Sequence, residues 1–406
     1  MYLILAWRNI WRNRRRSIIT ISSIGFAVLL ACVMRSLQLG SYERMIENSA
    51  RFYTGYIQVH DFGYWDEKTV DNSFQYDEDL KQVLASTEGV EVVVPRVESF
   101  ALSAFGNKTK GAMVLGVDPE LEHELTKVKD KMVEGEYLQK EDNAAIIGQG
   151  LAEYLNTGVG DTLILIGQGY HGANAAGLFL IKGIMKFPVP EQNNQTIYIP
   201  LSKAQDFYAM PDLLTSLSLV VDKVQNVDRI TNEIKAKVDL AELEVMDWQE
   251  MMPDLVQAIE IDDFSGRVML WILYAVIGFG MFGTFLMMTQ ERLYEFGVMM
   301  SIGMRRYVMQ FIVFMEMGML AAMGVFAGVG LSLPILVYYH NNPVFMSGES
   351  AEAIEQFGVE AAYFFSLESS LFYNQAWAIF FMAFVLALYP LFKIFRLKPV
   401  EAMRTA

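Results

Sequence analysis

Four long apolar stretches divide the chain, and they predict four membrane-spanning helices. These stretches are 17–34, 268–289, 307–339 and 369–391, and each is free of charged side chains, except that the third contains Glu316. At about 1.5 Å per residue, each can cross most or all of a hydrocarbon core of roughly 30 Å. We therefore predict spans at residues 17–39, 267–289, 307–339 and 369–392.

Lysines and arginines beside the spans indicate the orientation. Residues 1–16 contain five arginines and no acid, and basic residues also occur in 290–306 and 393–406. The segment 340–368 contains five glutamates and no lysine or arginine. Because cytoplasmic flanks are enriched in Lys and Arg, we expect both termini and 290–306 to be cytoplasmic. Residues 40–266 and the loop 340–368 then face outward.

The basic segment 1–16 has two faces when drawn as a helix. Leu3, Trp7, Ile10 and Trp11 fall on one side, and Arg8, Arg12 and Arg15 fall on the other. This pattern is typical of a helix lying on the inner leaflet, with tryptophans at headgroup level and arginines toward anionic lipid.

The segment 40–266 alternates short strand-like and helix-like stretches, which predicts an α+β domain. The fold class is therefore four transmembrane helices plus a large α+β extracytoplasmic domain. Asp77 and Ser202 suit helix N-caps, and the amphipathic residues 247–266 predict a stalk helix leading into the second span. The expected strands include 56–59, 92–94, 112–115, 162–166, 178–184 and 216–221, and the expected helices are 77–86, 149–156, 202–208 and 226–238.

Composition excludes several classes of function. The segment 40–266 contains 38 Asp and Glu against 18 Lys and Arg, so nucleic acid would be repelled. One cysteine, Cys32, permits neither a disulfide framework nor a thiolate metal cage. Four scattered histidines and the lack of a phosphate-loop or nucleophile-elbow motif predict no metal, no cofactor and no catalytic residue in this chain.

Small residues surround one aromatic side chain in the loop 167–177. The sequence there is GQGYHGANAAG, and it connects two predicted strands. A long solvated hairpin loop explains it, and so does a finger that docks a partner. In the second interpretation the docking side chains are Gln168, Tyr170, His171 and Asn174.

The cytoplasmic segment 290–306 is short, amphipathic and interrupted by glycines, so it is either an ordinary connecting loop or a lever for a soluble partner. Glu316 lies about ten residues beyond it in the third span, where an ionisable group is a functional candidate. We favour a structural bond from Glu316 to a neighbouring helix or to this segment. Gly324 and Gly328 have the spacing that permits close helix packing.

Several motifs resemble those of the FtsX/MacB/LolC–LolE superfamily of ABC-transporter permeases. The segment 290–306 contains Glu291-Arg292-x-x-Glu295-x-Gly297 followed by Ile302-Gly303, which resembles the hallmark of that superfamily. Further similar motifs, in order along the chain, are WRNxxRxxRRS at 7–17, IIGQGLA at 146–152 with VGD at 159–161 and IKGI at 181–184, Glu316 with Gly318, Gly324 and Gly328, and KPVEAMR at 398–404.

The resemblance implies how such a chain works. The six residues of the hallmark would couple the permease to a cytoplasmic ABC ATPase dimer, which binds ATP and Mg²⁺ in place of this chain. A second permease subunit, either a copy or a paralogue, would complete the membrane part. The chain would be a multi-pass protein of the bacterial inner membrane, with residues 40–266 in the periplasm.

Within the superfamily, the chain most resembles LolC/LolE lipoprotein-releasing permeases in size and in lacking a fused ATPase. That implies a lipoprotein substrate and a periplasmic lipoprotein carrier. The alternatives are a MacB-like driver of peptide or toxin efflux and an FtsX-like activator of a cell-wall hydrolase. Acyl chains need an apolar cleft, and side chains of spans one and two are candidates, although lipid-facing positions explain them equally: Phe26, Leu30, Val33, Leu37, Leu270, Leu273 and Ile277.

Overall fold

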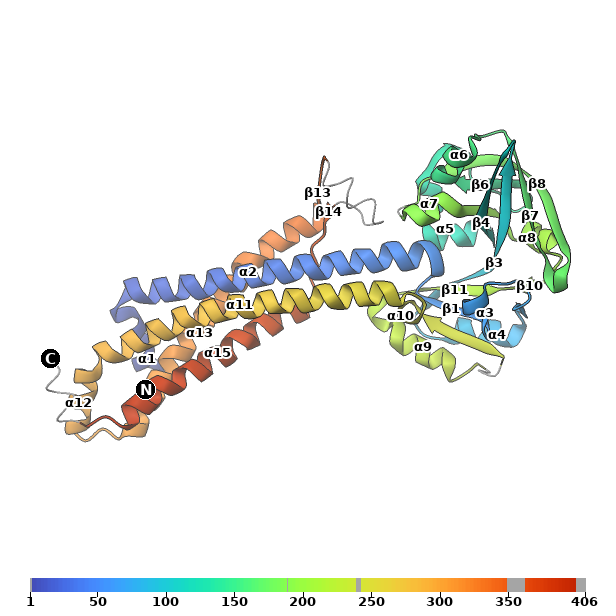
Figure 1. Ribbon diagram of the computed structural model, residues 1–406. Coiled ribbons are helices and arrows are strands. Elements are labelled where there is room, and N and C mark those ends of the chain that lie inside the picture. Colours follow the sequence, from blue (N-terminus) through green and yellow to red (C-terminus); the bar gives the residue numbers. More distant parts are fainter. Residues whose placement is uncertain (1, 188, 239–241, 349–361, 399–406) are drawn as a thin grey trace. The chain divides into compact units, whose positions relative to one another are not determined.

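The computed structural model describes residues 2–187, 189–238, 242–348 and 362–398, which belong to two compact units (Figure 1). The membrane unit comprises 1–43, 259–345 and 362–406, and the sheet domain comprises 44–258 and 346–361. The chain passes between the units within two long helices, α2 (Arg14–Ile46) and α11 (Pro253–Glu291).

Four helices of the described chain are long and apolar enough to cross a membrane, as predicted. Besides α2 and α11 they are α13 (Arg306–Asn341) and α15 (Ser369–Phe395). Each predicted span lies within one of them. Helices α2 and α11 continue beyond the predicted first and second spans. The helix α2 runs directly into a π-helical segment, Glu47–Thr54.

Close packing of the first and third spans depends on three glycines. Gly25 of α2 lies against Gly324 and Gly328 of α13, and a Cβ added to Gly328 would lie 2.5 Å from the Gly25 carbonyl oxygen. A Cβ added to Gly324 would lie equally close to Ile24 Cγ2, at 2.5 Å. Small residues let membrane helices approach to backbone contact, and the predicted role of the Gly324/Gly328 pair is confirmed.

The N-terminal helix α1 (Tyr2–Arg12) is shorter than the predicted segment 1–16. Asn13 separates it from α2, so Arg15 belongs to the next helix. In α1, Ile10 is buried with Ala6, whereas Leu3 and Trp7 are exposed. The bundle therefore covers one part of the apolar face and leaves the rest open.

Polar contacts join α2 and α11 near the point where each helix leaves the membrane unit. Arg35 of α2 contacts Asp263 of α11, and the Tyr42 hydroxyl donates to Asp262 Oδ2 at 2.6 Å. In the predicted outer loop 340–368, β13 (Val344–Phe345) pairs with β14 (Ala362–Tyr363). The acidic residues 349–361 of that loop, and residues 399–406 with most of the C-terminal motif, lie outside the described residues.

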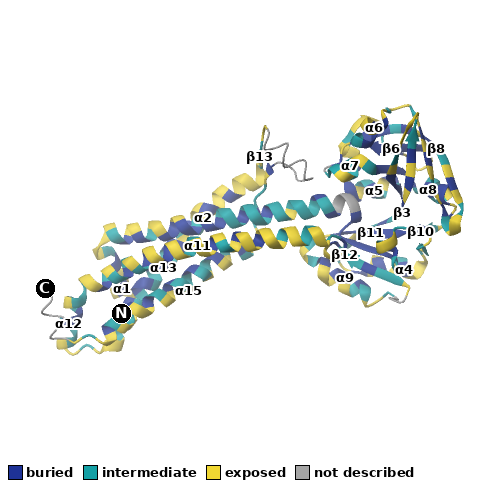
Figure 2. Ribbon diagram, in the orientation of Figure 1, coloured by how far each residue is buried: buried dark blue, intermediate teal, exposed yellow. Residues whose placement is uncertain are grey.

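The sheet domain is α+β, as predicted. Nine strands follow the order β12-β1-β11-β3-β4-β9-β6-β8-β5, and β7 pairs with both β3 and β8. Figure 2 shows buried residues concentrated along these strands. The strands are β1 (Ile57–Asp61), β3 (Val90–Phe105), β4 (Lys108–Val117), β5 (Met132–Gly135), β6 (Ala144–Gly148), β7 (Thr162–Gln168), β8 (Asn174–Met185), β9 (Thr196–Pro200), β11 (Ser216–Val221) and β12 (Leu243–Asp247), with a separate pair β2 (Phe74–Gln75) and β10 (Leu213–Leu214).

The helices of this domain are α3 (Tyr64–Glu67), α4 (Glu78–Ser86), α5 (Pro119–Thr126), α6 (Gln149–Leu155), α7 (Pro190–Gln195), α8 (Leu201–Tyr208), α9 (Val227–Lys235) and α10 (Trp248–Met251), with 3-10 turns at 128–131, 170–172 and 224–226. Asp77 caps α4 as predicted, accepting from the Leu80 amide at 2.8 Å. The Ser202 prediction is wrong, because α8 begins directly after Pro200 and Ser202 lies inside its first turn.

The stalk helix begins at Pro253 rather than at residue 247. Asp247 instead caps the short helix α10 in a capping box with Glu250. Proline disfavours helical geometry in the residue before it, and Met252 has φ −129° and ψ 62°. Pro253 therefore separates α10 from α11 and starts the long helix, the position in which proline is favoured.

Candidate functional site

The predicted coupling segment folds into a short helix between two spans. Glu291 ends α11, Arg292 is the junction, and α12 covers Leu293–Ser301. Gly303 adopts φ +100°, a conformation that favours glycine, and it terminates the turn after α12.

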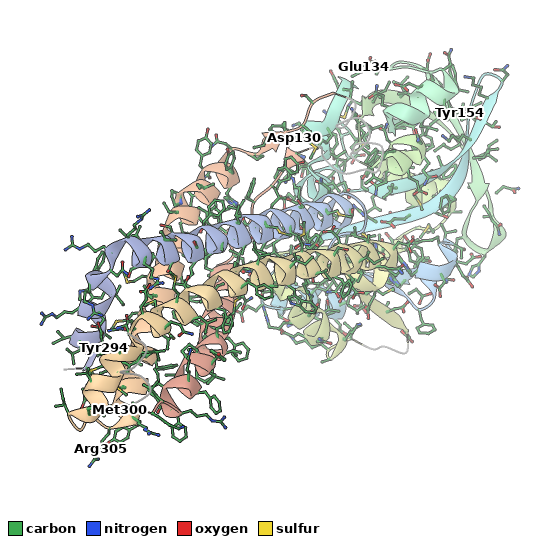
Figure 3. The ribbon with its side chains drawn as sticks, turned by 60° about the vertical axis from the view of Figure 1, so that its left-hand side comes forward. Asp130, Glu134, Tyr154, Tyr294, Met300 and Arg305 are labelled. Carbon is green, nitrogen blue, oxygen red and sulfur yellow. The ribbon has the colours of Figure 1, made fainter. Side chains whose placement is uncertain are left out.

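One side of α12 packs on the membrane unit and another faces away from it. Phe296 and Gly297 are buried, whereas Ile302 is 82% exposed and Tyr294 is half exposed. Figure 3 shows Tyr294, Met300 and Arg305 at this end of the bundle, with Arg305 pointing away from the helices. An exposed isoleucine and tyrosine beside two arginines offer a contact surface to a soluble protein.

Arginine–glutamate pairs hold the coupling segment in place. Arg12 of α1 donates to both oxygens of Glu295, at 2.8 and 2.9 Å, and Arg292 Nε lies 3.4 Å from Glu295 Oε2. The other side of the Arg292 guanidinium contacts Glu316, which is buried. We call Arg12, Glu295, Arg292 and Glu316 the α12 ion-pair network. The bond from Glu316 to the coupling segment that the sequence favoured is present.

A separate pair joins the same region to the first span: Arg16 of α2 contacts Glu291 at the end of α11. Burial raises the pKa of Glu295, but Arg12 and Arg292 outweigh it and hold that pKa below its usual value. Glu295 is therefore ionised at neutral pH, and its pairs weaken only on acidification.

An apolar groove of about 460 Å³ lies between α2 and α11. Three hydroxyl groups, Thr20, Ser23 and Thr284, are its polar lining, and the remaining lining residues are Ile24, Phe26, Ala27, Leu30, Leu273, Val276, Ile277, Gly280 and Met281. We call this the α2–α11 groove. Its size and lining suit a hydrocarbon chain.

Four of the seven predicted cleft residues line this groove: Phe26, Leu30, Leu273 and Ile277. Val33 and Leu37 lie further along α2 and do not line it, and Leu270 is buried. The sequence missed a second apolar groove of about 530 Å³ between α11 and α15, lined partly by exposed Trp271 and Phe279. In the sequence, this second groove is indicated by aromatic residues on a second face of α11.

The predicted docking loop is a short, folded hairpin tip. Gln168 and Asn174 are cross-strand partners at the ends of β7 and β8, so the connection is 169–173 rather than 167–177. The His171 amide donates to Asp71 Oδ1 at 2.6 Å, and a Cβ on Gly169 would lie 2.6 Å from the Tyr208 carbonyl oxygen. The tip is thus anchored on its own domain, while the Gln168, His171 and Asn174 side chains remain exposed.

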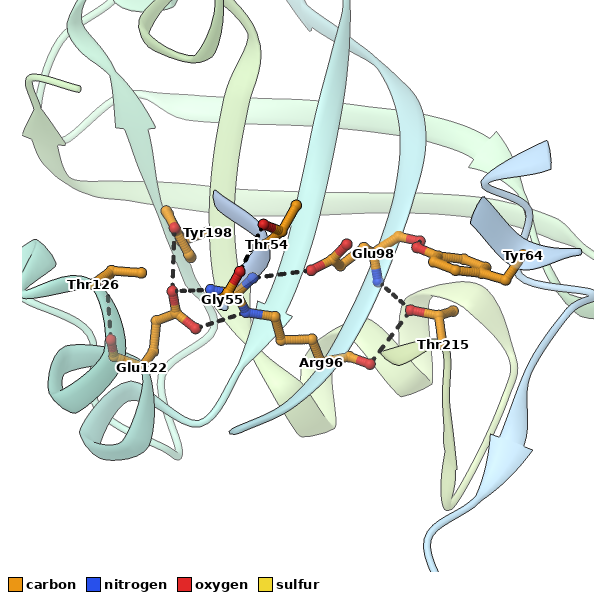
Figure 4. A network of polar contacts seen from close by, with 9 residues as sticks. All are labelled: Thr54, Gly55, Tyr64, Arg96, Glu98, Glu122, Thr126, Tyr198 and Thr215. Carbon is orange, nitrogen blue, oxygen red and sulfur yellow. Dashed lines mark hydrogen bonds and ion pairs between the residues drawn. The ribbon is translucent and has the colours of Figure 1, made fainter. Parts of the chain in front are cut away.

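A buried ion-pair network in the sheet domain was not predicted. Arg96 of β3 donates to both oxygens of Glu122 on α5, at 2.9 and 2.6 Å, and to Glu98 Oε1 at 3.1 Å (Figure 4). The Tyr198 hydroxyl also donates to Glu122, at 3.3 Å. Burial raises the pKa of Tyr198, and the Glu122 charge raises it further. The signal in the sequence was one arginine inside an apolar strand.

Among the described residues, no group of three or more His, Cys, Asp and Glu side chains is arranged to hold a metal ion.

Two family models match the chain. The MacB-like periplasmic core domain matches residues 17–237, and the FtsX-like permease C-terminal model matches residues 267–399. The chain is 22% identical over 298 residues to the lipoprotein-releasing system transmembrane protein LolC of Neisseria meningitidis, covering 71% of this chain and 69% of the relative. It is 19% identical over 321 residues to LolC of Xylella fastidiosa, covering 76% of each.

Two solved structures of extracytoplasmic transporter regions match part of this chain. The periplasmic region of MacB from Actinobacillus actinomycetemcomitans is 15% identical, with a TM-score of 0.36, and covers 53% of this chain and 97% of its own. The extracellular domain of the ABC-type transporter YknZ from Gram-positive bacteria is 14% identical, with a TM-score of 0.34, and covers 47% and 99%.

Proposed function

The chain belongs to the FtsX/MacB/LolC-type family of ABC-transporter permeases, and we propose that it is the membrane subunit of a lipoprotein-releasing transporter. Membership makes it a multi-pass inner-membrane protein with a periplasmic domain, and it implies an ATPase partner and a second permease subunit. The proposal adds the orientation, with both termini and α12 in the cytoplasm, and the cargo.

The α2–α11 groove is the observation that carries the proposal. An acylated protein leaving a bilayer needs a site in the membrane that accepts hydrocarbon at little cost. The groove offers about 460 Å³ of mostly apolar space between two spans. The similarity to two LolC proteins, each named as part of a lipoprotein-releasing system, supports the same cargo.

Energy would enter through α12. In this proposal an ATPase dimer binds ATP and Mg²⁺ and contacts the exposed Tyr294 and Ile302, while the buried Phe296 and Gly297 pass the movement to the bundle. The chain itself contributes no catalytic residue. A periplasmic carrier would receive the lipoprotein at the hairpin tip 169–173.

The test is ATP-driven release from proteoliposomes. The full chain is reconstituted with its co-encoded ATPase, any second permease subunit and an acylated lipoprotein, and release to a carrier is measured on adding ATP. We expect release that requires both ATP and the acyl chain. No release, with ATP hydrolysis intact and an adaptor or a cell-wall hydrolase bound instead, would contradict the proposal.

Two glycines of α11 provide a matched pair of variants. Gly280 lines the groove and Gly283 does not, and a Cβ at either position has open space around it. Gly280→Leu places a side chain in the groove where the acyl chain would lie, and it should reduce release about tenfold, which corresponds to about 1.4 kcal/mol of lost binding. Gly283→Leu should release normally. Equal effects of the two variants would mean that the groove does not hold the acyl chain.

The hairpin tip is tested separately. Because Gln168 and Asn174 are cross-strand partners, replacing 169–173 by Asn-Gly closes the hairpin with a favoured two-residue turn. We expect loss of transfer to the carrier with ATP hydrolysis retained. Unchanged transfer would remove the tip from the docking surface and leave the groove proposal standing.

A further inference from the structure

The N-terminal helix α1 is attached to α2 and to α13, the helix that follows the coupling segment. Its buried Ile10 packs into the bundle, and the Ile10 carbonyl accepts from Ser17 Oγ at 2.6 Å, which fixes the bend between α1 and α2. The Tyr2 and Phe311 rings lie edge to face with centroids 6.3 Å apart, joining α1 to α13. Several contacts therefore hold α1 in a defined position on the bundle, in addition to its connection to α2.

The α12 ion-pair network continues this attachment. It alternates in charge from Arg12 to Glu295, Arg292 and Glu316, and the side chains become steadily less exposed, at 55%, 41%, 13% and 3%. Arg12 lies in α1, Glu295 in α12 and Glu316 in α13, and Arg292 directly precedes α12. Arg292 has apolar neighbours, including Phe296 and Val313, so its charge depends on Glu316 and Glu295 for compensation.

From these contacts we infer that α1 is part of the coupling device, with Arg12 as a positioning residue that makes α1 and α12 move as one body. The inference rests on the proposed function, because it needs an ATPase that pushes α12. It assigns Arg12 a role through Glu295, without contact to cargo or nucleotide.

The contacts of Arg12 favour a role in positioning α12 over a role in stabilising the fold. An exposed ion pair contributes little to folding free energy, but one Arg12 nitrogen, Nη2, donates to both oxygens of Glu295, and these charge-assisted hydrogen bonds hold α1 and α12 close together. Without Arg12, Glu295 keeps only the longer 3.4 Å contact to Arg292, and that guanidinium is then shared between two carboxylates without a second cation. The orientation of α12 against α1 is lost before the fold is.

Release per ATP hydrolysed is the first readout. Arg12→Glu should lower it about tenfold, within the range of typical coupling free energies between sites. The control is Arg8→Glu, the same charge change one turn earlier on α1, where the arginine makes no ion pair with any described residue. If Arg8→Glu lowers release per ATP as much as Arg12→Glu does, the effect comes from lost lipid contact and the inference is overturned.

The Arg16–Glu291 contact supplies a charge-swap cycle. Each side chain has the other as its ion-pair partner in the described chain. Arg16→Glu alone should also lower release per ATP, and Arg16→Glu combined with Glu291→Arg should restore it. If release per ATP in the double variant stays as low as in Arg16→Glu alone, Arg16 and Glu291 do not act as a pair.

A cargo-independent readout separates this inference from the proposed function. With Cys32 replaced by alanine, spin labels at Asn9 and exposed Ser301 report the distance between α1 and α12 in the reconstituted complex. We expect one narrow distribution, the same with and without ATP, that broadens in Arg12→Glu. If that result appears without lipoprotein release, only the proposed function fails. If release occurs but the wild-type distance changes with ATP, only this inference fails.

Discussion

Two regions of the molecule use the same chemistry, arginine against glutamate, in opposite surroundings. In the sheet domain, the buried ion-pair network has side-chain exposures of 0% for Arg96, 0% for Glu122 and 4% for Glu98. In the membrane unit, the α12 ion-pair network runs from 55% side-chain exposure at Arg12 to 3% at Glu316. The first is sealed from water, and the second begins at the surface and ends inside the bundle.

This difference in burial distinguishes a network that stabilises the fold from one that suits the transmission of movement. A sealed network must be complete, because removing one partner leaves an uncompensated buried charge. It therefore fixes β3 against α5 in one arrangement. A graded network tolerates loss at its exposed end and becomes more costly to break toward its interior. That gradient suits a connection between elements that have to move together.

The largest expected effect is at the sealed network. Arg96→Leu leaves Glu122 and Glu98 buried without their cation, and it should lower the free energy of unfolding of the sheet domain by about 3–5 kcal/mol. The measurement is denaturant unfolding of the full chain, followed by a probe in the sheet domain. The matched control is Lys237→Leu, which breaks an exposed contact to Glu233 four residues away, worth about 0.3–0.5 kcal/mol. Equal effects would show that the network is not sealed.

Glu316→Leu comes next. It leaves the Arg292 charge with Glu295 alone, and we expect a destabilisation of the membrane unit of about 3 kcal/mol, at the lower end for a broken buried pair. Arg12→Leu, at the exposed end, should cost about 0–1 kcal/mol. Thermal unfolding in one detergent compares the two. A larger effect of Arg12→Leu would reverse the gradient and refute the comparison.

A third prediction concerns pH and one buried lysine of the sheet domain. The Lys68 amine lies 3.1 Å from the centre of the Trp65 ring and has no hydrogen-bond partner among the described residues. Burial lowers the pKa of Lys68 to about 8, although the Glu98 charge opposes the shift. Between this value and the ordinary lysine value near 10.4, the unfolded chain binds more protons than the folded one.

The free energy of unfolding of the sheet domain should therefore rise between about pH 8 and pH 10, by at most about 3 kcal/mol. Lys68→Met removes this rise, and Lys81→Met on exposed α4 retains it. The measurement is denaturant unfolding at several pH values. A wild-type curve parallel to that of Lys68→Met across this interval would show that Lys68 is solvated in the folded domain.

The sequence predicted the features that depend on long stretches of chain. Four spans follow from uninterrupted apolar runs, and the α+β domain follows from alternating short elements. Several local predictions also held: Asp77 caps α4, and Gly324 and Gly328 contact a neighbouring helix. These depend on residues close together in sequence, or on a spacing that has one physical use in a membrane helix.

Features that depend on distant pairs could not be predicted. Nothing near Arg96 in sequence indicates that Glu122 will lie opposite it, and Arg12 is 283 residues from Glu295. The α2–α11 groove is an intermediate case. The sequence placed Phe26 and Ile277 on the correct helices, but the exact face depends on how α2 and α11 pack, which excluded Val33, Leu37 and Leu270. Ser202 failed because Pro200 started the helix earlier.

The central claim is that ATP hydrolysed by another polypeptide moves the sheet domain through this chain. The most direct measurement places spin labels at exposed Tyr154 in the sheet domain and exposed Tyr338 in α13, in a Cys32→Ala background, in the reconstituted complex. We predict that the distance distribution between them shifts on addition of ATP and Mg²⁺ when the ATPase is present, and does not shift without it. An unchanged distribution during active ATP hydrolysis would contradict the account.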